Sequence, residues 1–276
     1  MRDLAEQFSR DGYAMLPALA SRSEVAAIAQ QVDDALCNEK AVHLRGKVKR
    51  KGYALRNLLD RVPLIAQWAI SPLVLEQLAP LFAPSFGEST YENRPVIQPV
   101  RGILFDKAPH ANWCVGWHQD QAIAVRQKPD GEALIELQRA GFGPWSVKDG
   151  LVHVEPPADV LDAMVTIRLH LDTCTQYDGP LRVIPGSHAL GRLTVEQTKQ
   201  IVAEQTAITC KVNAGDAMVM KPLLLHASGR VNEHCENEGQ DDLGVTKRVF
   251  RRRVVHIEYA AVTLPAPLRW CSPSVG

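Results

Sequence analysis

The chain changes character at about residue 95, and this change constrains its fold more than any other feature. Before that point helical signals dominate. Ser21 and Glu24 form a capping box, and the apolar residues behind them recur at helical spacing. Ser71–Pro72 places a cap before a proline at the first helical position, which predicts a second helix through about Leu81.

The rest of the chain is typical of strands. Short β-branched runs alternate with glycine, proline, asparagine and aspartate turn signals. The predicted strands cover residues 96–105, 163–171, 181–184, 207–212, 217–220 and 250–259. One helix interrupts them, because Thr194 and Gln197 form a second capping box.

Helices first and strands later indicate an α+β protein, mainly β, in which helices from the N-terminal part buttress one face of an antiparallel sandwich. No Pro/Gly/Ser-rich linker divides the sequence. We therefore expect a single domain over residues 1–276, with a helical front end at 1–90 and a strand-rich core with insertions at 95–262.

Charge and composition exclude several classes of protein. Lys+Arg and Asp+Glu both total 31, so the chain has no overall attraction to nucleic acid or to an anionic membrane. The basic run Arg251–Arg253 follows an acidic stretch at 233–242, and a solvated loop and strand start explain it better than a nucleic-acid patch. No apolar run reaches the roughly 20 residues of a membrane span. The first residues carry acids in place of an apolar signal, and the six cysteines form no C-x-x-C pair. We expect a cytoplasmic protein, monomeric or a small homo-oligomer, without nucleic-acid or membrane partners.

The strongest chemical signal is the tetrapeptide Trp117–Asp120. Residues i and i+2 of a strand point to the same face, so His118 and Asp120 offer an imidazole and a carboxylate together. His226 suits the third ligand position, since its run follows the turn at 213–216 and indicates the end of a late strand. Two histidines and one carboxylate form the facial triad of non-haem Fe(II) sites, which leaves three coordination positions open. An H-x-D pair is also often an ordinary hydrogen bond, and that alternative stays open at this point.

A keto acid bound to such an iron needs a partner for its far carboxylate, and the guanidinium fork of arginine matches a carboxylate best. The last predicted strand supplies Arg251, Arg252 and Arg253 as candidates. Arg251 and Arg253 share one face and Arg252 lies on the other, and periodicity alone does not choose between the faces. Four other histidines are expected to be structural: His153, His170, His188 and His256.

Several stretches beyond the triad carry a resemblance. They are 104–107 with 112–113, the turn DGPLRVIPGSH at 178–188, Gly215–Asp216 before His226–Gly229, and the opening at 8–13. Together they resemble the phytanoyl-CoA dioxygenase family of Fe(II)/2-oxoglutarate-dependent oxygenases over essentially the whole chain. The resemblance implies a double-stranded β-helix (jelly roll) with its site in the barrel mouth, Fe(II) as the metal, 2-oxoglutarate as cosubstrate, and O2.

The resemblance also implies roles for particular residues. It places the 2-oxoglutarate anchor at Arg252, with Ser228 beside it. Arg168 lies on a strand that lines the cosubstrate pocket in the family, although an arginine exposed on the rim is the alternative. Lys107 and Trp145 are candidates for the substrate side, against ordinary packing or surface roles.

The implied reaction is hydroxylation of an unactivated C–H of a small-molecule metabolite, with release of succinate and CO2. The family includes halogenases in which a small residue replaces the carboxylate ligand, and the presence of Asp120 argues against halogenation. The acidic insert at 232–246 departs from the family pattern and is a candidate substrate lid. Two alternatives remain: a cupin-like metalloenzyme (an isomerase or a keto-acid-independent dioxygenase), and a non-catalytic small-molecule-binding jelly roll, which the intact triad disfavours.

Overall fold

The computed structural model describes residues 2–42, 54–82, 96–108, 111–148, 150–231 and 251–271. In chain order the helices are α1 (Arg2–Asp11), α2 (Arg22–Val42), α3 (Leu58–Arg61), α4 (Pro63–Ala69), α5 (Pro72–Phe82), α6 (Gly131–Arg139), α7 (Ala158–Asp162), the 3-10 helix η3 (Ser187–Leu190) and α8 (Val195–Glu204). The strands are β1 (Tyr13–Leu16), β2 (Ala54–Arg56), β3 (Gln98–Lys107), β4 (Val115–His118), β5 (Ile123–Val125), β6 (Trp145–Lys148), β7 (Leu151–Val154), β8 (Met164–His170), β9 (Leu181–Val183), β10 (Ile208–Cys210), β11 (Ala217–Met220), β12 (His226–Ser228) and β13 (Arg252–Ala260).

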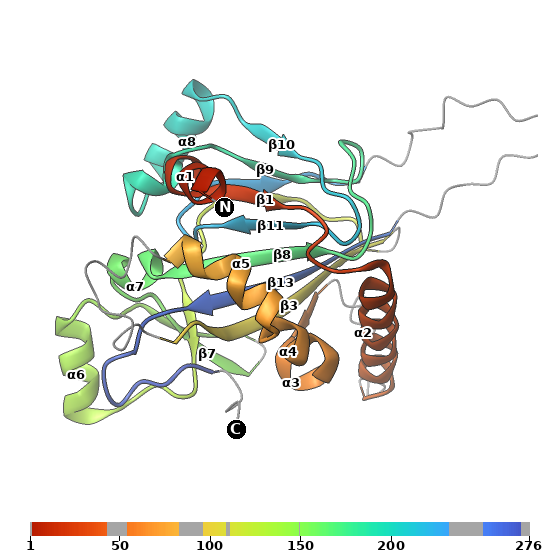
Figure 1. The fold of residues 1–276 in the computed structure, drawn as a ribbon. Coiled ribbons are helices and arrows are strands. Elements are labelled where there is room, and N and C mark those ends of the chain that lie inside the picture. Colours follow the sequence, from red (N-terminus) through yellow and green to blue (C-terminus); the bar gives the residue numbers. More distant parts are fainter. Residues whose placement is uncertain are drawn as a thin grey trace, which may run out of the picture.

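The strands form three antiparallel sheets (Figure 1). A six-stranded sheet has the order β1-β11-β8-β13-β3-β2, and a four-stranded sheet has the order β10-β9-β12-β4. These two sheets build the expected double-stranded β-helix, and no strand pair among the described residues closes them into a barrel. The third sheet, β5-β7-β6, is an insertion between β4 and β8.

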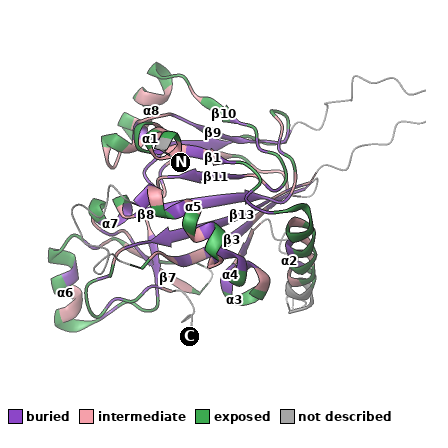
Figure 2. Ribbon diagram, viewed as in Figure 1, coloured by how far each residue is buried: buried purple, intermediate pink, exposed green. Residues whose placement is uncertain are grey.

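The N-terminal helices cover one face of the six-stranded sheet, as the sequence predicts (Figure 1). Apolar residues of α2 to α5 pack on the outward side chains of β8, β11 and β13 in one buried cluster. Figure 2 shows the result, with the strands of the sheet mostly buried and the outer sides of α2 and α8 exposed. Tyr259 on β13 also donates a hydrogen bond from its hydroxyl to the Ala69 carbonyl of α4, at 3.0 Å.

All three predicted helix starts are confirmed. Glu24 accepts a hydrogen bond from the Ser21 backbone amide at 2.8 Å, and α2 follows. α5 begins at Pro72, and the Thr194–Gln197 capping box opens α8. Among the described residues no single helix is long and apolar enough to cross a membrane, while α4 and α5, which meet at a 50° bend, pass that test only as a pair.

The sequence analysis missed β1 and β2, which lie in the front end expected to be helical, and the three short strands between β4 and β8. Residues 123–154 form the three-stranded sheet and α6, and Phe142 and Leu137 belong to a hydrophobic cluster shared with β3, β8 and β13. Strands of three or four residues hold too little β-branched sequence to be recognised by pattern. The acidic insert at 232–246 lies outside the described residues, and the single-domain interpretation stays a prediction.

Candidate functional site

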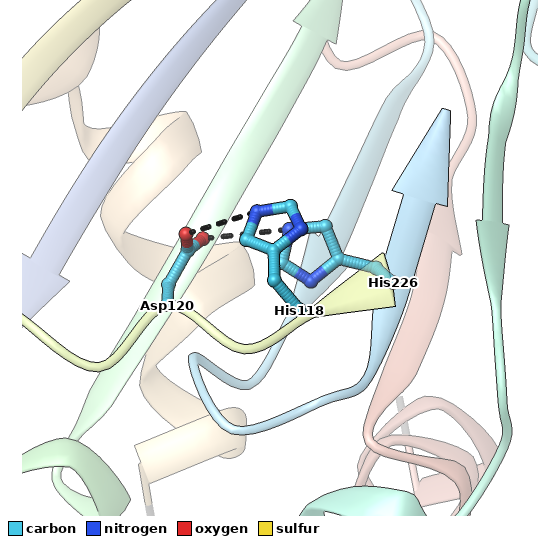
Figure 3. Close-up of side chains that lie close together, drawn as sticks. All are labelled: His118, Asp120 and His226. Atoms are coloured by element: carbon cyan, nitrogen blue, oxygen red, sulfur yellow. Dashed lines mark ion pairs between the residues drawn. The ribbon is translucent and has the colours of Figure 1, made fainter. Parts of the chain in front are cut away.

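Two histidines meet on neighbouring strands of the four-stranded sheet (Figure 3). His118 is the last residue of β4 and His226 is the first residue of β12. The two are register partners across the antiparallel pair, and their ring centroids lie 4.2 Å apart. His226 was expected to end a strand. It begins one instead, because a turn at 221–225 separates it from β11.

The carboxylate of Asp120 completes the group. Asp120 was expected on the same strand as His118, but it lies two residues past the end of β4. Its backbone amide donates to the Pro222 carbonyl at 2.9 Å. Its Oδ1 lies 3.8 Å from Nε2 of His118, and its Oδ2 lies 3.8 Å from Nε2 of His226. All three ligand atoms lie within 4.8 Å of one another.

The backbone fixes both imidazoles with the correct nitrogen facing inward. Nδ1 of His118 lies 2.8 Å from the Gly116 carbonyl, and Nδ1 of His226 lies 2.8 Å from the Leu224 carbonyl. A carbonyl oxygen only accepts, so each Nδ1 carries the proton and each Nε2 keeps its lone pair toward Asp120. Metal-binding histidines are oriented in this way.

The protonation states of His226 and Asp120 also suit a bound metal ion. Burial lowers the pKa of His226 to about 4, although Asp120 opposes this shift, so the imidazole is neutral at pH 7. Burial would raise the pKa of Asp120, but the nearby His226, His256 and His118 outweigh it and lower this pKa to about 2. The neutral imidazole of His226 and the ionised carboxylate of Asp120, with His118 beside them, fit a divalent cation bound at about 2.1 Å.

Gln119 is a structural residue that the sequence analysis missed. Its buried amide donates to the carbonyls of Gly191 at 2.8 Å and Leu223 at 2.7 Å, and it accepts from the Leu193 amide at 2.9 Å. It therefore ties the ligand segment to the loop before α8 and to the turn before His226. The sequence signal that could have revealed this role is the position of Gln119 between the two candidate ligands of the H-x-D pair.

The signature turn at 178–188 supports the same site. The Ser187 hydroxyl donates to the Ile184 carbonyl at 2.7 Å and accepts from the Leu225 amide at 2.8 Å, which fixes the residue before His226. At the other end of the turn, Gly179 has a φ of +62°, and a Cβ there would lie 2.6 Å from the Gly229 carbonyl oxygen. Only glycine fits this conformation and this close approach.

Arg252 lies between the two sheets, on the inner face of β13. It is buried, and its guanidinium donates to the Gly179 carbonyl. Its Nε has no hydrogen-bond partner among the described residues. Burial lowers the pKa of this guanidinium from its ordinary value, which still leaves it positively charged at pH 7.

Lys107 and Ser228 meet beside Arg252, and they connect the two sheets. Lys107 is the register partner of Arg252 and is completely buried. Its Nζ lies 3.2 Å from Oγ of Ser228 and also donates to the Gly229 carbonyl. Burial, with the nearby charges of Arg252 and Arg168, lowers the pKa of Lys107 to about 7. The structure thus places Lys107 with the expected cosubstrate residues.

Arg168 is the third buried cation of this interior. It is 6% exposed, so the alternative of an arginine on the rim is wrong. One guanidinium nitrogen donates to Nδ1 of His256 at 2.9 Å, and its Nε has no partner among the described residues. Burial and the charge of Arg252 lower the pKa of Arg168 to about 10.

The other candidates lie elsewhere. Arg251 and Arg253 face α2, where both contact Asp33 at 2.6 and 3.1 Å. Trp145 begins β6 and packs against the cluster of the three-stranded sheet, with Lys128 over its ring at 5.8 Å. The substrate-side role of Trp145 stays a prediction.

An open cleft of about 510 Å³ adjoins the ligand strand. His118 lines it together with Trp117 and Gln121 on one side and residues of α8 on the other. The His118 side chain is 40% exposed, so the candidate metal site is accessible to a ligand from outside. The volume is that of a small-molecule site.

The fold and the His–Asp–His group define a class: double-stranded β-helix proteins with a candidate two-histidine, one-carboxylate metal site. The chain belongs to the phytanoyl-CoA dioxygenase (PhyH) family, whose profile matches residues 8–233. No curated protein matches the sequence.

Solved structures share the fold. The non-heme, alpha-ketoglutarate-dependent carbocyclase SnoK from nogalamycin biosynthesis gives a TM-score of 0.62 at 14% identity, covering 94% of this chain and 83% of that chain. EctD from S. alaskensis, solved with 2-oxoglutarate and 5-hydroxyectoine, gives 0.64 at 18%, covering 95% and 76%. AviO1 from Streptomyces viridochromogenes Tue57 gives 0.60 at 20%, covering 96% and 97%. At these identities the likeness establishes the fold alone.

Proposed function

We propose that this protein is an Fe(II)- and 2-oxoglutarate-dependent oxygenase that hydroxylates an unactivated C–H of a small-molecule metabolite. Membership of the PhyH family supports the general class. EctD, which shares the fold, was solved with 2-oxoglutarate and, in another crystal, with Fe. The hydroxylation outcome is the finer part of the proposal, since SnoK uses the same fold as a carbocyclase.

One observation carries the proposal: two buried guanidinium groups, each with an unpartnered Nε, share the interior with a triad of metal-ligating atoms. The Nε atoms of Arg168 and Arg252 are both buried without a hydrogen-bond partner among the described residues. A buried guanidinium without a full set of acceptors is costly, so these two predict an anionic ligand. A dicarboxylate that also chelates a metal satisfies both requirements.

Each residue then has a role. His118, Asp120 and His226 hold Fe(II), which supplies O2 activation coupled to decarboxylation of 2-oxoglutarate to succinate and CO2. Arg252 and Ser228 bind the far carboxylate of the cosubstrate, and Lys107 holds Ser228 in place from the neighbouring sheet. We therefore assign Lys107 to the cosubstrate side and keep Trp145 as a substrate-side candidate.

Arg168 contributes a second positive charge between the triad and Arg252. It interacts electrostatically with both Asp120 and Arg252, which supports a role for it in binding the cosubstrate. In a site shielded from water such fixed charges orient an anion without reorganisation. Because Asp120 fills the carboxylate position of the triad, the proposal is hydroxylation and not halogenation.

The cleft between β4 and α8 provides the route for the substrate. It is open to solvent, it reaches His118, and both apolar and polar side chains line it. We propose a small-molecule substrate, no nucleic-acid or membrane partner, a cytoplasmic location, and a monomer or small homo-oligomer.

Titration of 2-oxoglutarate into the anaerobic Fe(II) protein tests the proposal. Bidentate chelation of the keto acid produces a visible charge-transfer band, whereas a keto-acid-independent metalloenzyme binds Fe(II) without one. We expect Asp120→Ala to weaken Fe(II) binding by at least about 100-fold and to abolish the band. Glu132→Ala, which removes an exposed carboxylate on α6, is the matched control. Wild-type Fe(II) affinity in Asp120→Ala, or no band in the wild type, would contradict the proposal.

A further inference from the structure

A continuous row of buried polar side chains crosses the inner face of the six-stranded sheet. It consists of Arg168 on β8, His256 and Glu258 on β13, and Arg101 on β3. His256 is the register partner of Arg168, and Glu258 is the register partner of Arg101. β13 lies between β8 and β3, so the four side chains form two adjacent cross-strand pairs.

The contacts in this row are close. A guanidinium nitrogen of Arg168 lies 2.9 Å from Nδ1 of His256. Nε2 of His256 lies 3.5 Å from Oε1 of Glu258, and Arg101 donates to the same oxygen at 2.9 Å. His256 and Glu258 are 3% and 5% exposed, so these contacts are shielded from solvent.

The chemistry of the partners fixes the tautomer of His256. A guanidinium has only donors, so Nδ1 of His256 must accept and carries no proton. The proton therefore sits on Nε2, which faces the carboxylate of Glu258. Arg168 thus donates to His256, and the Nε2 proton of His256 points toward the Glu258 carboxylate. Arg101 donates to the same carboxylate and holds it in place.

Arg168 needs a neighbour that fixes the orientation of its guanidinium. Its guanidinium is repelled by the nearby Arg252 and carries no carboxylate partner within hydrogen-bond distance among the described residues. Among the described residues, the hydrogen bond of this side chain goes to His256. That bond leaves Nε unpartnered and buried, with Asp120 and Arg252 both within electrostatic reach.

We infer that His256 is a positioning residue. Held in turn by Glu258 and Arg101, it fixes the Arg168 guanidinium at the angle that presents the remaining donors of Arg168 to the cosubstrate. This inference rests on the proposed function, because it assumes that an anion binds beside Arg168. It assigns a role to a histidine that the sequence alone indicates only as structural.

The test is calorimetric titration of 2-oxoglutarate into anaerobic Fe(II)-loaded protein. His256→Leu removes both hydrogen-bonding atoms, and we expect it to raise the Kd by roughly tenfold or more, since a hydrogen bond to a charged group is lost. His256→Asn keeps an acceptor near the position of Nδ1, and we expect a change below about threefold. Phe105→Leu is the packing control, because this ring contacts both His256 at 5.7 Å and Arg168 at 5.5 Å without a hydrogen bond.

A double-mutant cycle separates positioning from simple packing. If His256 acts through Arg168, His256→Leu adds less than about a twofold further change in a protein that already carries Arg168→Met. Fully additive effects, or a wild-type Kd in His256→Leu, would overturn the inference while the wild type still binds 2-oxoglutarate. If the wild type itself does not bind 2-oxoglutarate, the proposed function fails first, and the inference falls with it. Should His256→Leu not fold, His256→Asn and His256→Gln carry the same comparison.

Discussion

At the scale of single residues, the clearest division of labour is among the three consecutive arginines of β13. Alternation along the strand sends Arg252 inward, between the sheets, and sends Arg251 and Arg253 outward to acids. Arg251 pairs with Asp106 at 2.8 Å, and Arg253 pairs with Asp172 at 2.7 Å. Only the inward arginine is available to an anion in the interior.

The first prediction follows from this alternation. Arg252→Ala should raise the Kd for 2-oxoglutarate by about 100-fold, because a buried bidentate contact to a carboxylate is lost. Arg251→Ala and Arg253→Ala should change it by less than about threefold, since each removes a partly exposed ion pair. The measurement is the same anaerobic titration. Arg252→Lys serves as the control for charge, and we expect it to fall between wild type and Arg252→Ala.

Equal losses from all three alanine variants would show that neither face of the strand alone supplies the anchor. A loss confined to Arg253→Ala would move the anchor to the helix-covered face of the sheet. Either result contradicts the assignment of Arg252.

At the scale of elements, Gln119 joins three segments that sequence separates widely. It lies just past β4, and its partners lie in the loop before α8 and in the turn that leads into β12. The amide has the two donors and the acceptor that this junction requires. It holds the two ligand strands and one wall of the cleft in a fixed relation.

Gln119→Ala should therefore lower both stability and metal affinity. The buried Gln119 side chain loses three hydrogen bonds to backbone, and we expect the free energy of unfolding to fall by about 2–3 kcal/mol in urea denaturation. Fe(II) affinity should fall roughly tenfold, as for other residues that orient metal ligands. Gln121→Ala removes one half-buried amide that bonds to Gln119 and is the matched control. An unfolding free energy and an Fe(II) affinity within error of wild type would exclude the tethering role.

The elements also show what the sequence could predict. The helix starts at Ser21, Ser71 and Thr194 were readable because capping chemistry is local. The long strands β3, β8 and β13 were readable from their β-branched runs. The short strands β4 and β12 carry the two histidines, and strands were expected there, but their bounds and their pairing with each other were not readable. Their pairing is set by tertiary contacts such as those of Gln119, which no local pattern contains.

At the site, the sequence predicted which residues take part better than it predicted how they are arranged. The three ligand residues were found from the H-x-D spacing and one distant histidine, and the structure brings them within ligand distance of one another. The arginine face was left open by periodicity and was chosen by family resemblance. His256 was missed as a functional candidate because its partner Arg168 is 88 residues away in the sequence.

At the scale of the whole molecule, the interior holds buried histidines, among them His153, His170, His226 and His256. A consequence is sensitivity to acid. His153 on β7 is 1% exposed, and its Nε2 has no partner among the described residues. Burial, helped by the charge of Arg101, lowers the pKa of His153 to about 4. In the unfolded chain this histidine binds a proton near pH 6.5.

The sign of the effect follows from proton binding. Between pH 6.5 and pH 4 the unfolded chain binds a proton at His153 that the native protein does not, so the free energy of unfolding falls as the pH is lowered through this range. We expect His153 alone to account for about 1–2 kcal/mol of this fall at pH 5, measured by urea denaturation of the metal-free protein. His153→Asn keeps a donor for the Leu151 carbonyl, which Nδ1 contacts at 3.0 Å, and does not titrate. Its unfolding free energy should therefore decline less steeply below pH 6.5 than that of the wild type, and identical slopes for the two proteins would show that His153 is protonated in the native state.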